Sequence, residues 1–332
     1  MNQATWVGFE EKAVVIAWLS PAARGYGMRA AAARGRQLLL KTFDSHFHII
    51  DPRFPLVPNQ GYLPPAFTAK DYSAAAEGFK FLSVRGGAVV SGSFQLFDQS
   101  YLVAALQELG PGYVGVTQLP LDEPVDGALV EQLSAQGVRA IRYNVTRGLA
   151  GAGGATDSTE AMRAQALAVH ALAGWHAEFY IDCALLLEDK RLFSLLASLP
   201  AVVVDHVGFS AAGLAPLLRL LDCRAGKLKT AVKLTGFGRY LGSREELRHS
   251  LCELLRRHPD CLVFGSDLPS TRARVPFDED GDVGLVRECV QDICHRAEGG
   301  GGGGGVEAEE SLMQRIFWDN AHALYLAGRD RH

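Results

Sequence analysis

Eight short apolar runs, each followed by a helical pattern, constrain the fold of this chain more than any other feature. The runs are 42–48, 87–92, 113–119, 139–145, 176–182, 201–206, 230–236 and 261–267. Helices are expected at 98–109, 125–136, 159–173, 184–198, 211–222, 243–257 and 283–297. Strands that alternate with helices in this way pair in parallel. Eight such units predict an α/β fold, a single-domain (β/α)8 TIM barrel.

The barrel is expected to form one domain over residues 42–327. Its last helix, 309–327, has apolar residues at helical spacing and is expected to pack on the exterior or bottom of the barrel. The glycine run at 299–305 is typical of a flexible, low-complexity insertion. Residues 49–80 are rich in proline, and we expect them to form a long loop that acts as a lid.

Residues 1–41 form an N-terminal extension outside the barrel. No acid lies between Ala13 and the end of this segment, and arginines alternate with alanines, which resembles an organelle transit peptide. Glu10 and Glu11 do not fit that pattern. A disordered tail, or an upstream extension before a start at Met28, are the other interpretations. We therefore expect a cytoplasmic protein, with the mitochondrion or plastid as the alternative.

Composition excludes several functional classes. The formal net charge of −4 argues against general nucleic-acid binding, and no apolar run approaches the ~20 residues of a membrane span. The six cysteines form no CxxC pair, so we expect reduced thiols in an intracellular protein. The expected partner is a small molecule, and homo-oligomerisation is left open.

Polar residues gather at the ends of the predicted strands, where TIM barrels place their chemistry. His46 and His48 lie two apart in the first run, so both face the same side of a strand. The later runs end in Arg142 and Asn144, in Glu178, Tyr180 and Asp182, in His206, in Lys233 and Thr235, and in Asp267. Buried polar and charged groups need partners or a task, so we predict an active site at this end of the barrel.

Six segments, in chain order, resemble the amidohydrolase superfamily. They are FDSHFHIID, GVRAIRYNV, AGWHAEFYID, VVVDHVG, VKLTGFGRY and LVFGSDLP. They are most similar to the amidohydrolase-related TIM-barrel family that contains 2-pyrone-4,6-dicarboxylate lactonase. The resemblance implies hydrolysis at a carbonyl group, with Asp267 as the general base. It also implies that His206 stabilises the developing oxyanion or positions the water.

The sequence leaves two roles open for His46 and His48. Together with Asp267 they bind one divalent metal, zinc or manganese, or they polarise the substrate carbonyl directly. Metal-bearing relatives have a third histidine on strand five, where this chain has Tyr180. The lactonase that the chain resembles has the tyrosine and works without metal. We therefore expect no required metal, count Tyr180 as catalytic, and expect Asp44 on the same strand face as a structural acid.

Arginines near the mouth indicate an anionic substrate. Arg142 and Arg147 follow the fourth strand and Arg239 follows the seventh. Guanidinium groups bind carboxylates through paired hydrogen bonds, and Tyr62 in the lid is expected to add another. The chain departs from the lactonase pattern at Phe209, which replaces an arginine, and this departure leaves the substrate's identity open.

These observations predict a hydrolase that opens a cyclic ester, a carboxylated lactone, with water activated by Asp267. One alternative is a metal-dependent decarboxylase, or an amide or ester hydrolase, of the same superfamily. Another is a barrel that has lost catalysis and acts as a binding protein. The presence of His46, His48 and His206 together with Asp267 argues against that last alternative.

Overall fold

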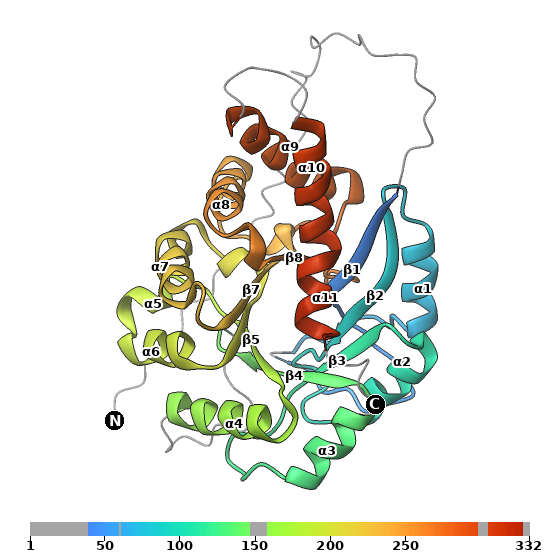
Figure 1. The fold of residues 1–332 in the computed structure, drawn as a ribbon. Coiled ribbons are helices and arrows are strands. Elements are labelled where there is room, and N and C mark those ends of the chain that lie inside the picture. The colour runs from blue at the N-terminus through green and yellow to red at the C-terminus, as the bar shows by residue number, and fades with distance from the viewer. Residues whose placement is uncertain (1–38, 60, 147–157, 298–304, 328–332) are drawn as a thin grey trace, which may run out of the picture. The chain divides into compact units, whose positions relative to one another are not determined.

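The computed structural model describes residues 39–59, 61–146, 158–297 and 305–327. Eight parallel strands form one sheet in the order β1 to β8, and helices alternate with them along the chain (Figure 1). The strands are β1 Leu40–Phe47, β2 Leu82–Val90, β3 Tyr113–Thr117, β4 Val138–Asn144, β5 His176–Tyr180, β6 Ala201–Val204, β7 Lys229–Leu234 and β8 Leu262–Phe264. The predicted (β/α)8 barrel is confirmed.

The helices follow the strands in the expected order. They are α1 Ala69–Glu77, α2 Ser100–Leu109, α3 Gly127–Ala135, α4 Ser158–Ala173, α5 Leu185–Glu188, α6 Lys190–Ser198, α7 Leu214–Arg224, α8 Arg244–Arg257, α9 Glu279–Ala297, α10 Gly305–Gln314 and α11 Asn320–Tyr325. Short 3-10 turns are η1 His206–Gly208, η2 Ala211–Gly213, η3 Phe237–Arg239 and η4 Pro259–Cys261, and the π-helical turn η5 Arg315–Asp319 joins α10 to α11.

Backbone hydrogen bonds close the barrel between its first and last strands. The amide of Asp267 donates to the carbonyl of His46, and the amide of His48 donates to the carbonyl of Leu268, each at 2.7 Å. Gly265 makes this approach feasible, because a Cβ there would lie 2.8 Å from the backbone nitrogen of His46. The seam therefore sets the strand-one histidines directly beside the strand-eight aspartate.

Aromatic pairs fix the surrounding helices to the strands. Phe47 of β1 stacks on Tyr72 of α1 with ring centroids 3.6 Å apart. Phe264 of β8 stacks on Phe317 of η5 at 4.4 Å. All four rings are buried, and truncating one to alanine in such a core typically costs about 3–5 kcal/mol.

Apolar side chains and one tyrosine fill the lower interior of the barrel. The cluster includes Phe43, Ala88, Val114, Ala140, Val203, Ala231, Val263 and Tyr325. Tyr325 of α11 stacks on Phe43 at 5.2 Å, and its hydroxyl donates to Glu178 of β5 at 2.6 Å. The last helix, red in Figure 1, therefore packs at the bottom of the barrel, one of the two positions expected for it.

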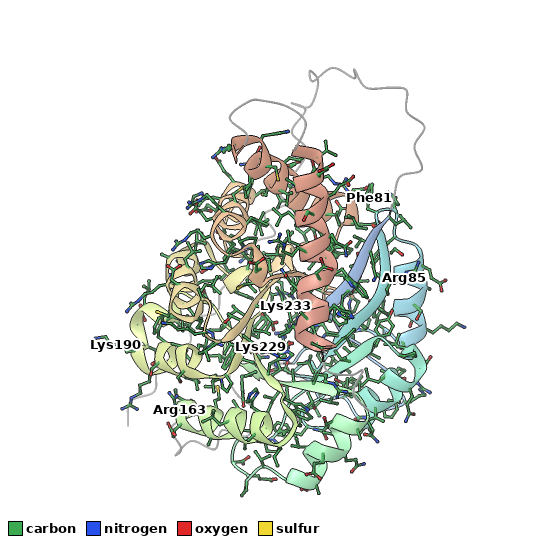
Figure 2. The ribbon with its side chains drawn as sticks, viewed as in Figure 1. Phe81, Arg85, Arg163, Lys190, Lys229 and Lys233 are labelled. Carbon is green, nitrogen blue, oxygen red and sulfur yellow. The ribbon has the colours of Figure 1, made fainter. Side chains whose placement is uncertain are left out.

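Strand β7 carries one lysine at its exposed start and one in the buried interior of the barrel. Lys229, at the start of the strand, is exposed, whereas Lys233 is completely buried (Figure 2). A charge in that interior requires partners within the barrel.

Three local features differ from the expectations. Residues 49–80 are not one loop, since 69–77 form α1 behind a capping box of Thr68 and Asp71. The predicted helix 184–198 is two helices, because Asp189 is extended and caps α6 with its side chain. Strand β2 starts at residue 82, five residues before the apolar run that predicted it.

Some expectations fall on parts of the chain that the structure does not describe. The N-terminal extension lies outside the described residues except for 39–41, and of these Leu40 and Lys41 already belong to β1. Arg147 also lies outside them, as does the glycine run apart from Gly305. Within the described ranges, no helix combines the length and apolar character needed to cross a membrane.

Asp282, in the first turn of α9, provides a test of this packing. Burial raises the pKa of its carboxyl group from 3.8 to about 7. A raised carboxyl pKa makes the folded state less stable as pH rises from about 4 to 7, because the unfolded chain ionises first. We expect Asp282→Asn to be more stable than wild type at pH 8 by about 2 to 4 kcal/mol in urea unfolding.

The gain from Asp282→Asn should vanish near pH 4, where the carboxyl group is protonated in the folded protein. Asp280→Asn is the control, because the side chain of Asp280 is 55% exposed in the same turn. A stability gain that stays constant between pH 4 and pH 8 would contradict a pKa of Asp282 raised by its partial burial.

Candidate active site

A pocket opens at the carboxyl ends of the strands, with about 300 Å³ of empty space that includes solvent at its open side. Its lining residues are His48, Gly92, Ser93, Phe94, Arg142, Asn144, Tyr180, His206, Arg239 and Thr271. Five of them were predicted as site residues from the sequence. Two further predicted residues, His46 and Asp267, lie next to His48. The barrel thus gathers these side chains in one place from strands far apart in the sequence.

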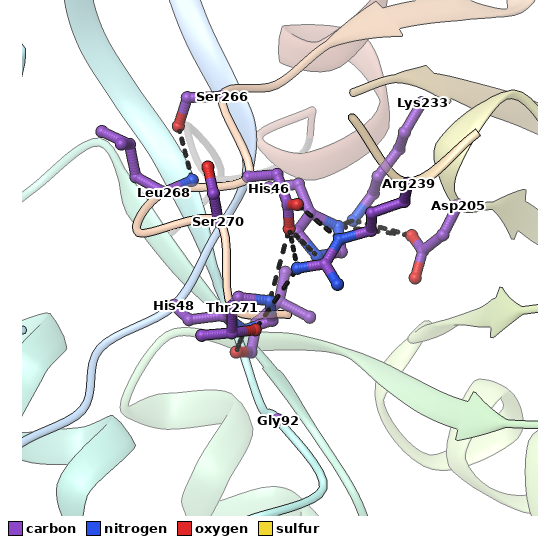
Figure 3. Close-up of polar contacts among 12 residues, drawn as sticks. His46, His48, Gly92, Asp205, Lys233, Arg239, Ser266, Leu268, Ser270 and Thr271 are labelled. Atoms are coloured by element: carbon purple, nitrogen blue, oxygen red, sulfur yellow. Dashed lines mark hydrogen bonds and ion pairs between the residues drawn. The ribbon is translucent and has the colours of Figure 1, made fainter. Parts of the chain in front are cut away.

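Asp267 contacts His46, His48 and Arg239, which Figure 3 labels. Its carboxylate accepts hydrogen bonds from Arg239 Nε at 2.6 Å and Nη2 at 3.3 Å. Its Oδ1 lies 3.6 Å from His48 Nε2 and 3.8 Å from His46 Nε2. Burial opposes ionisation, but Arg239 and the nearby histidines keep the pKa of Asp267 well below 3.8. Asp267 is therefore a carboxylate at neutral pH.

The two strand-one histidines are neutral and aim ring nitrogens at Asp267. Burial lowers the pKa of His48, and burial together with Lys233 lowers the pKa of His46 well below 6.5. His48 Nδ1 lies 2.7 Å from the carbonyl of Val90, which can only accept, so this nitrogen carries the proton. The neutral ring then presents an unprotonated Nε2 to the mouth.

Asp44 does not share the direction of these histidines, contrary to the expectation from alternate spacing. The pairing of β1 with β2 shifts between Asp44 and Phe47, and such a bulge interrupts the alternation of side chains. Asp44 accepts hydrogen bonds from the Ser266 hydroxyl at 2.7 Å and the Tyr72 hydroxyl at 3.1 Å. It fastens α1 and the end of β8 to β1 and does not line the pocket.

A second layer of charges lies beneath the pocket. Arg142 donates to Asp205 Oδ2 from Nε at 3.0 Å and Nη2 at 2.9 Å. Lys233 Nζ donates to Glu178 Oε2 at 2.5 Å. Although burial opposes their ionisation, Lys233 and Arg142 hold the pKa of Asp205 well below its ordinary value, and Lys233 and His176 lower that of Glu178. These side chains form a buried network of alternating charges.

Backbone conformation directs His206 and Asp267 into the site. Both are in the left-handed region, with φ of 53° and 59°, which typically costs a non-glycine residue about 1–3 kcal/mol. Gly236, which follows β7, lies against both side chains. A Cβ at this position would be 2.4 Å from His206 Nδ1 and 3.2 Å from Asp267 Oδ2. Only glycine lets these two side chains keep their places.

Two predicted substrate-binding residues are not part of the pocket as described. Tyr62 is absent from the lining and instead lies under the guanidinium of Arg272, 4.6 Å from its ring centroid. Arg147 lies outside the described residues. Phe209, the departure from the lactonase pattern, packs edge-on against Tyr180 at 5.2 Å.

Several site residues were not assigned a role from the sequence. Ser93, Phe94 and Thr271 line the pocket from the loops after β2 and β8. Their positions just beyond strand ends could have indicated a site role. Uncharged loop residues of these types are common, however, so the sequence does not single them out. Asp205 comes directly before His206 in VVVDH. Its pairing with Arg142 connects β4 to the end of β6, across the intervening β5.

The mouth has the composition of a metal site. His46, His48 and Asp267 place one ligand atom each within 4.8 Å of one another, and all three are buried. Two imidazoles and a carboxylate suit zinc or manganese. His46 Nε2 is buried with no hydrogen-bond partner among the residues described, which fits a nitrogen that binds a cation. The residues present therefore fit a divalent metal.

Comparison with solved structures agrees with this architecture. A Pseudomonas putida protein provisionally assigned as a 2-pyrone-4,6-dicarboxylic acid hydrolase is 27% identical, with a TM-score of 0.63, over 87% of this chain and 98% of its own. An Acinetobacter baumannii protein with the same provisional assignment, solved with citric acid bound, is 18% identical, with a TM-score of 0.64, over 86% and 98%. No curated protein gives a significant sequence match.

A family model described as amidohydrolase matches residues 43–326. Proteins of this family typically use a metal. The expectation that no metal is required is therefore wrong, since the family and the His46, His48 and Asp267 group both point to one. That expectation was based on Tyr180, which stands where a third histidine would be. His46, His48 and Asp267 form a three-residue ligand group without a histidine at this position. As the match spans most of the sequence, this chain belongs to the amidohydrolase family and is a hydrolase.

Proposed function

We propose that this protein opens a carboxylated lactone by attack of water on the ester carbonyl. One observation carries the proposal: a carboxylate and three histidines lie in or directly beside a pocket that Arg142 and Arg239 line. The first set suits hydrolysis of a carbonyl compound, and the arginines suit recognition of carboxylates. The provisional assignment of the Pseudomonas putida protein supports this substrate class, since a pyrone is a cyclic ester.

The balance of buried charge favours an anionic substrate. Three cationic and three carboxylate side chains neutralise one another here, namely Arg142, Lys233, Arg239, Glu178, Asp205 and Asp267. A divalent cation at the mouth adds two positive charges that no member of this set offsets. A substrate with two carboxylates complements that excess.

His46, His48 and Asp267 would hold the cation, which supplies positive charge that polarises a carbonyl group and lowers the pKa of water. His206 lines the pocket beside them, and burial lowers its pKa to about 4. It is therefore neutral at pH 7, with one ring N–H to donate to the oxygen on which negative charge develops. This role matches the one expected for His206 from the sequence.

Asp267 receives the proton of the attacking water in this scheme. Its low pKa makes it a weak base, so it holds the proton only briefly. The ester C–O bond then breaks, and the leaving oxygen takes the proton from Asp267. The products are a carboxylic acid, which releases its proton to solvent and becomes a carboxylate, and a hydroxyl group on one opened chain.

Arg239 has donors left for the substrate. Its Nε and Nη2 bind Asp267 and Thr271, while its Nη1 makes no hydrogen bond within the described part of the chain. A substrate carboxylate that binds Nη1 lies next to Asp267, which places the ester carbonyl near the attacking water.

Arg239→Gln tests anion recognition. We expect kcat/KM for a carboxylated lactone to fall at least 10-fold further than kcat/KM for the same lactone without its carboxylate, because a charge-assisted hydrogen bond contributes about 1.5–3 kcal/mol. Both substrates are assayed with wild type and variant. Arg163→Gln, on the surface of α4, is the control and should leave both values unchanged. Equal losses for the two lactones would contradict carboxylate binding by Arg239.

Gly236→Ala tests the placement of His206 and Asp267. The added methyl group displaces one of these side chains, so we expect turnover to fall at least ~100-fold while the fold, measured by circular dichroism, is retained. Gly174→Ala is the matched control, since Gly174 also has positive φ, +69°, but has no neighbouring atom within 4 Å of the added position. If Gly236→Ala keeps the turnover of Gly174→Ala, the close packing at Gly236 has no bearing on the reaction.

A further inference from the structure

Lys233 is a buried charge that the proposed hydrolysis does not use. It lies on β7 (Figure 2), does not line the pocket, and is completely buried. Its Nζ donates to Glu178 Oε2 at 2.5 Å, and lies 3.3 Å from His46 Nδ1 and 3.5 Å from Asp205 Oδ1 (Figure 3). It therefore contacts the mouth residues from beneath.

Two groups of side chains in this barrel have the composition of a metal site, and they share His46. The mouth group is His46, His48 and Asp267, and the deep group is His46, Asp205 and His206. In each group the ligand atoms lie within 4.8 Å of one another. Asp205 Oδ1 and His206 Nδ1 are buried and make no hydrogen bond to any described residue. By its side chains alone, the deep group would also suit a cation.

The ammonium group of Lys233 already lies against two of the deep group's members, His46 and Asp205. A metal ion bound to the same atoms would lie within a few ångströms of this positive charge, in an interior that screens charges poorly. The ion pair with Glu178 keeps the ammonium group in place.

Glu178 is itself held by residues at the bottom of the barrel. Its Oε1 accepts a hydrogen bond from the Tyr325 hydroxyl at 2.6 Å and lies 3.1 Å from His176 Nε2. If Lys233 moved to another partner, the buried carboxylate of Glu178 would lose its cation, which is strongly unfavourable. The last helix thus supports the position of Lys233 through Glu178.

We propose that Lys233 is a built-in cation that fills the deep group and confines the protein to a single metal ion, at the mouth group. Lys233 is a positioning residue in this account, since it acts on where the metal binds and not on the substrate. The inference rests on the proposed function only in its use of the mouth group as the metal site. Exclusion of metal from the deep group holds whichever carbonyl compound is hydrolysed.

A gain of metal binding tests the proposal. His48→Ala combined with Asp267→Asn removes two of the three mouth ligands, and we expect this background protein to bind no manganese in equilibrium dialysis followed by elemental analysis. Adding Lys233→Ala should restore one manganese ion per chain, at the deep group. Adding Lys229→Ala, an exposed lysine of the same strand, should restore none. A further Asp205→Asn substitution should abolish the restored binding.

Folding is controlled in parallel. Lys233→Ala leaves Glu178 without its cation, so each such protein is also made with Glu178→Gln, and circular dichroism shows which are folded. A folded Lys233→Ala protein that binds no manganese overturns the proposal. A background protein that binds manganese with Lys233 in place also overturns it.

The wild-type protein gives a further test that needs no variant. We expect one manganese ion per chain at saturation, and two ions would overturn the proposal. These outcomes are separate from the reaction itself. A wild type that binds one ion but hydrolyses no lactone would refute the proposed function and leave the role of Lys233 standing.

Discussion

The site depends on one constraint: a charge inside a barrel of aliphatic strands must have a partner. The chain meets it with three ion pairs, each of which joins two different strands or strand ends. The pairs are Arg142 with Asp205, Lys233 with Glu178, and Arg239 with Asp267. Because these pairs cross the interior, they hold the strand ends at fixed separations.

The apolar framework and the site are connected through the same groups. Tyr325 plugs the bottom of the barrel and binds Glu178, which holds Lys233 against His46. His206 has a strained, left-handed backbone, and its side chain packs directly against Gly236, which has no Cβ. Residues that do not line the pocket, Tyr325, Glu178, Lys233 and Gly236, thus fix the side chains at the mouth in position.

The barrel and most of its mouth could be predicted from the sequence, because alternating strands and helices set the fold and strand ends set the active-site face. The direction of the Asp44 side chain could not be predicted, because the alternation of apolar and polar residues does not reveal a one-residue bulge. Helix α1 was obscured by the prolines before it, although Thr68 and Asp71 carried its capping signal. The expectation that no metal is required was wrong because it was based on Tyr180 of strand five. The ligand group that His46 and His48 form with Asp267 does not include that strand.

The central claim is that the mouth group binds a metal ion that the hydrolysis requires. The most direct measurement is lactone hydrolysis by protein stripped of metal with a chelator and then titrated with manganese or zinc. The account predicts that stripped protein loses turnover and that activity returns in proportion to added metal, with saturation at one ion per chain. Full turnover by the stripped protein would contradict it.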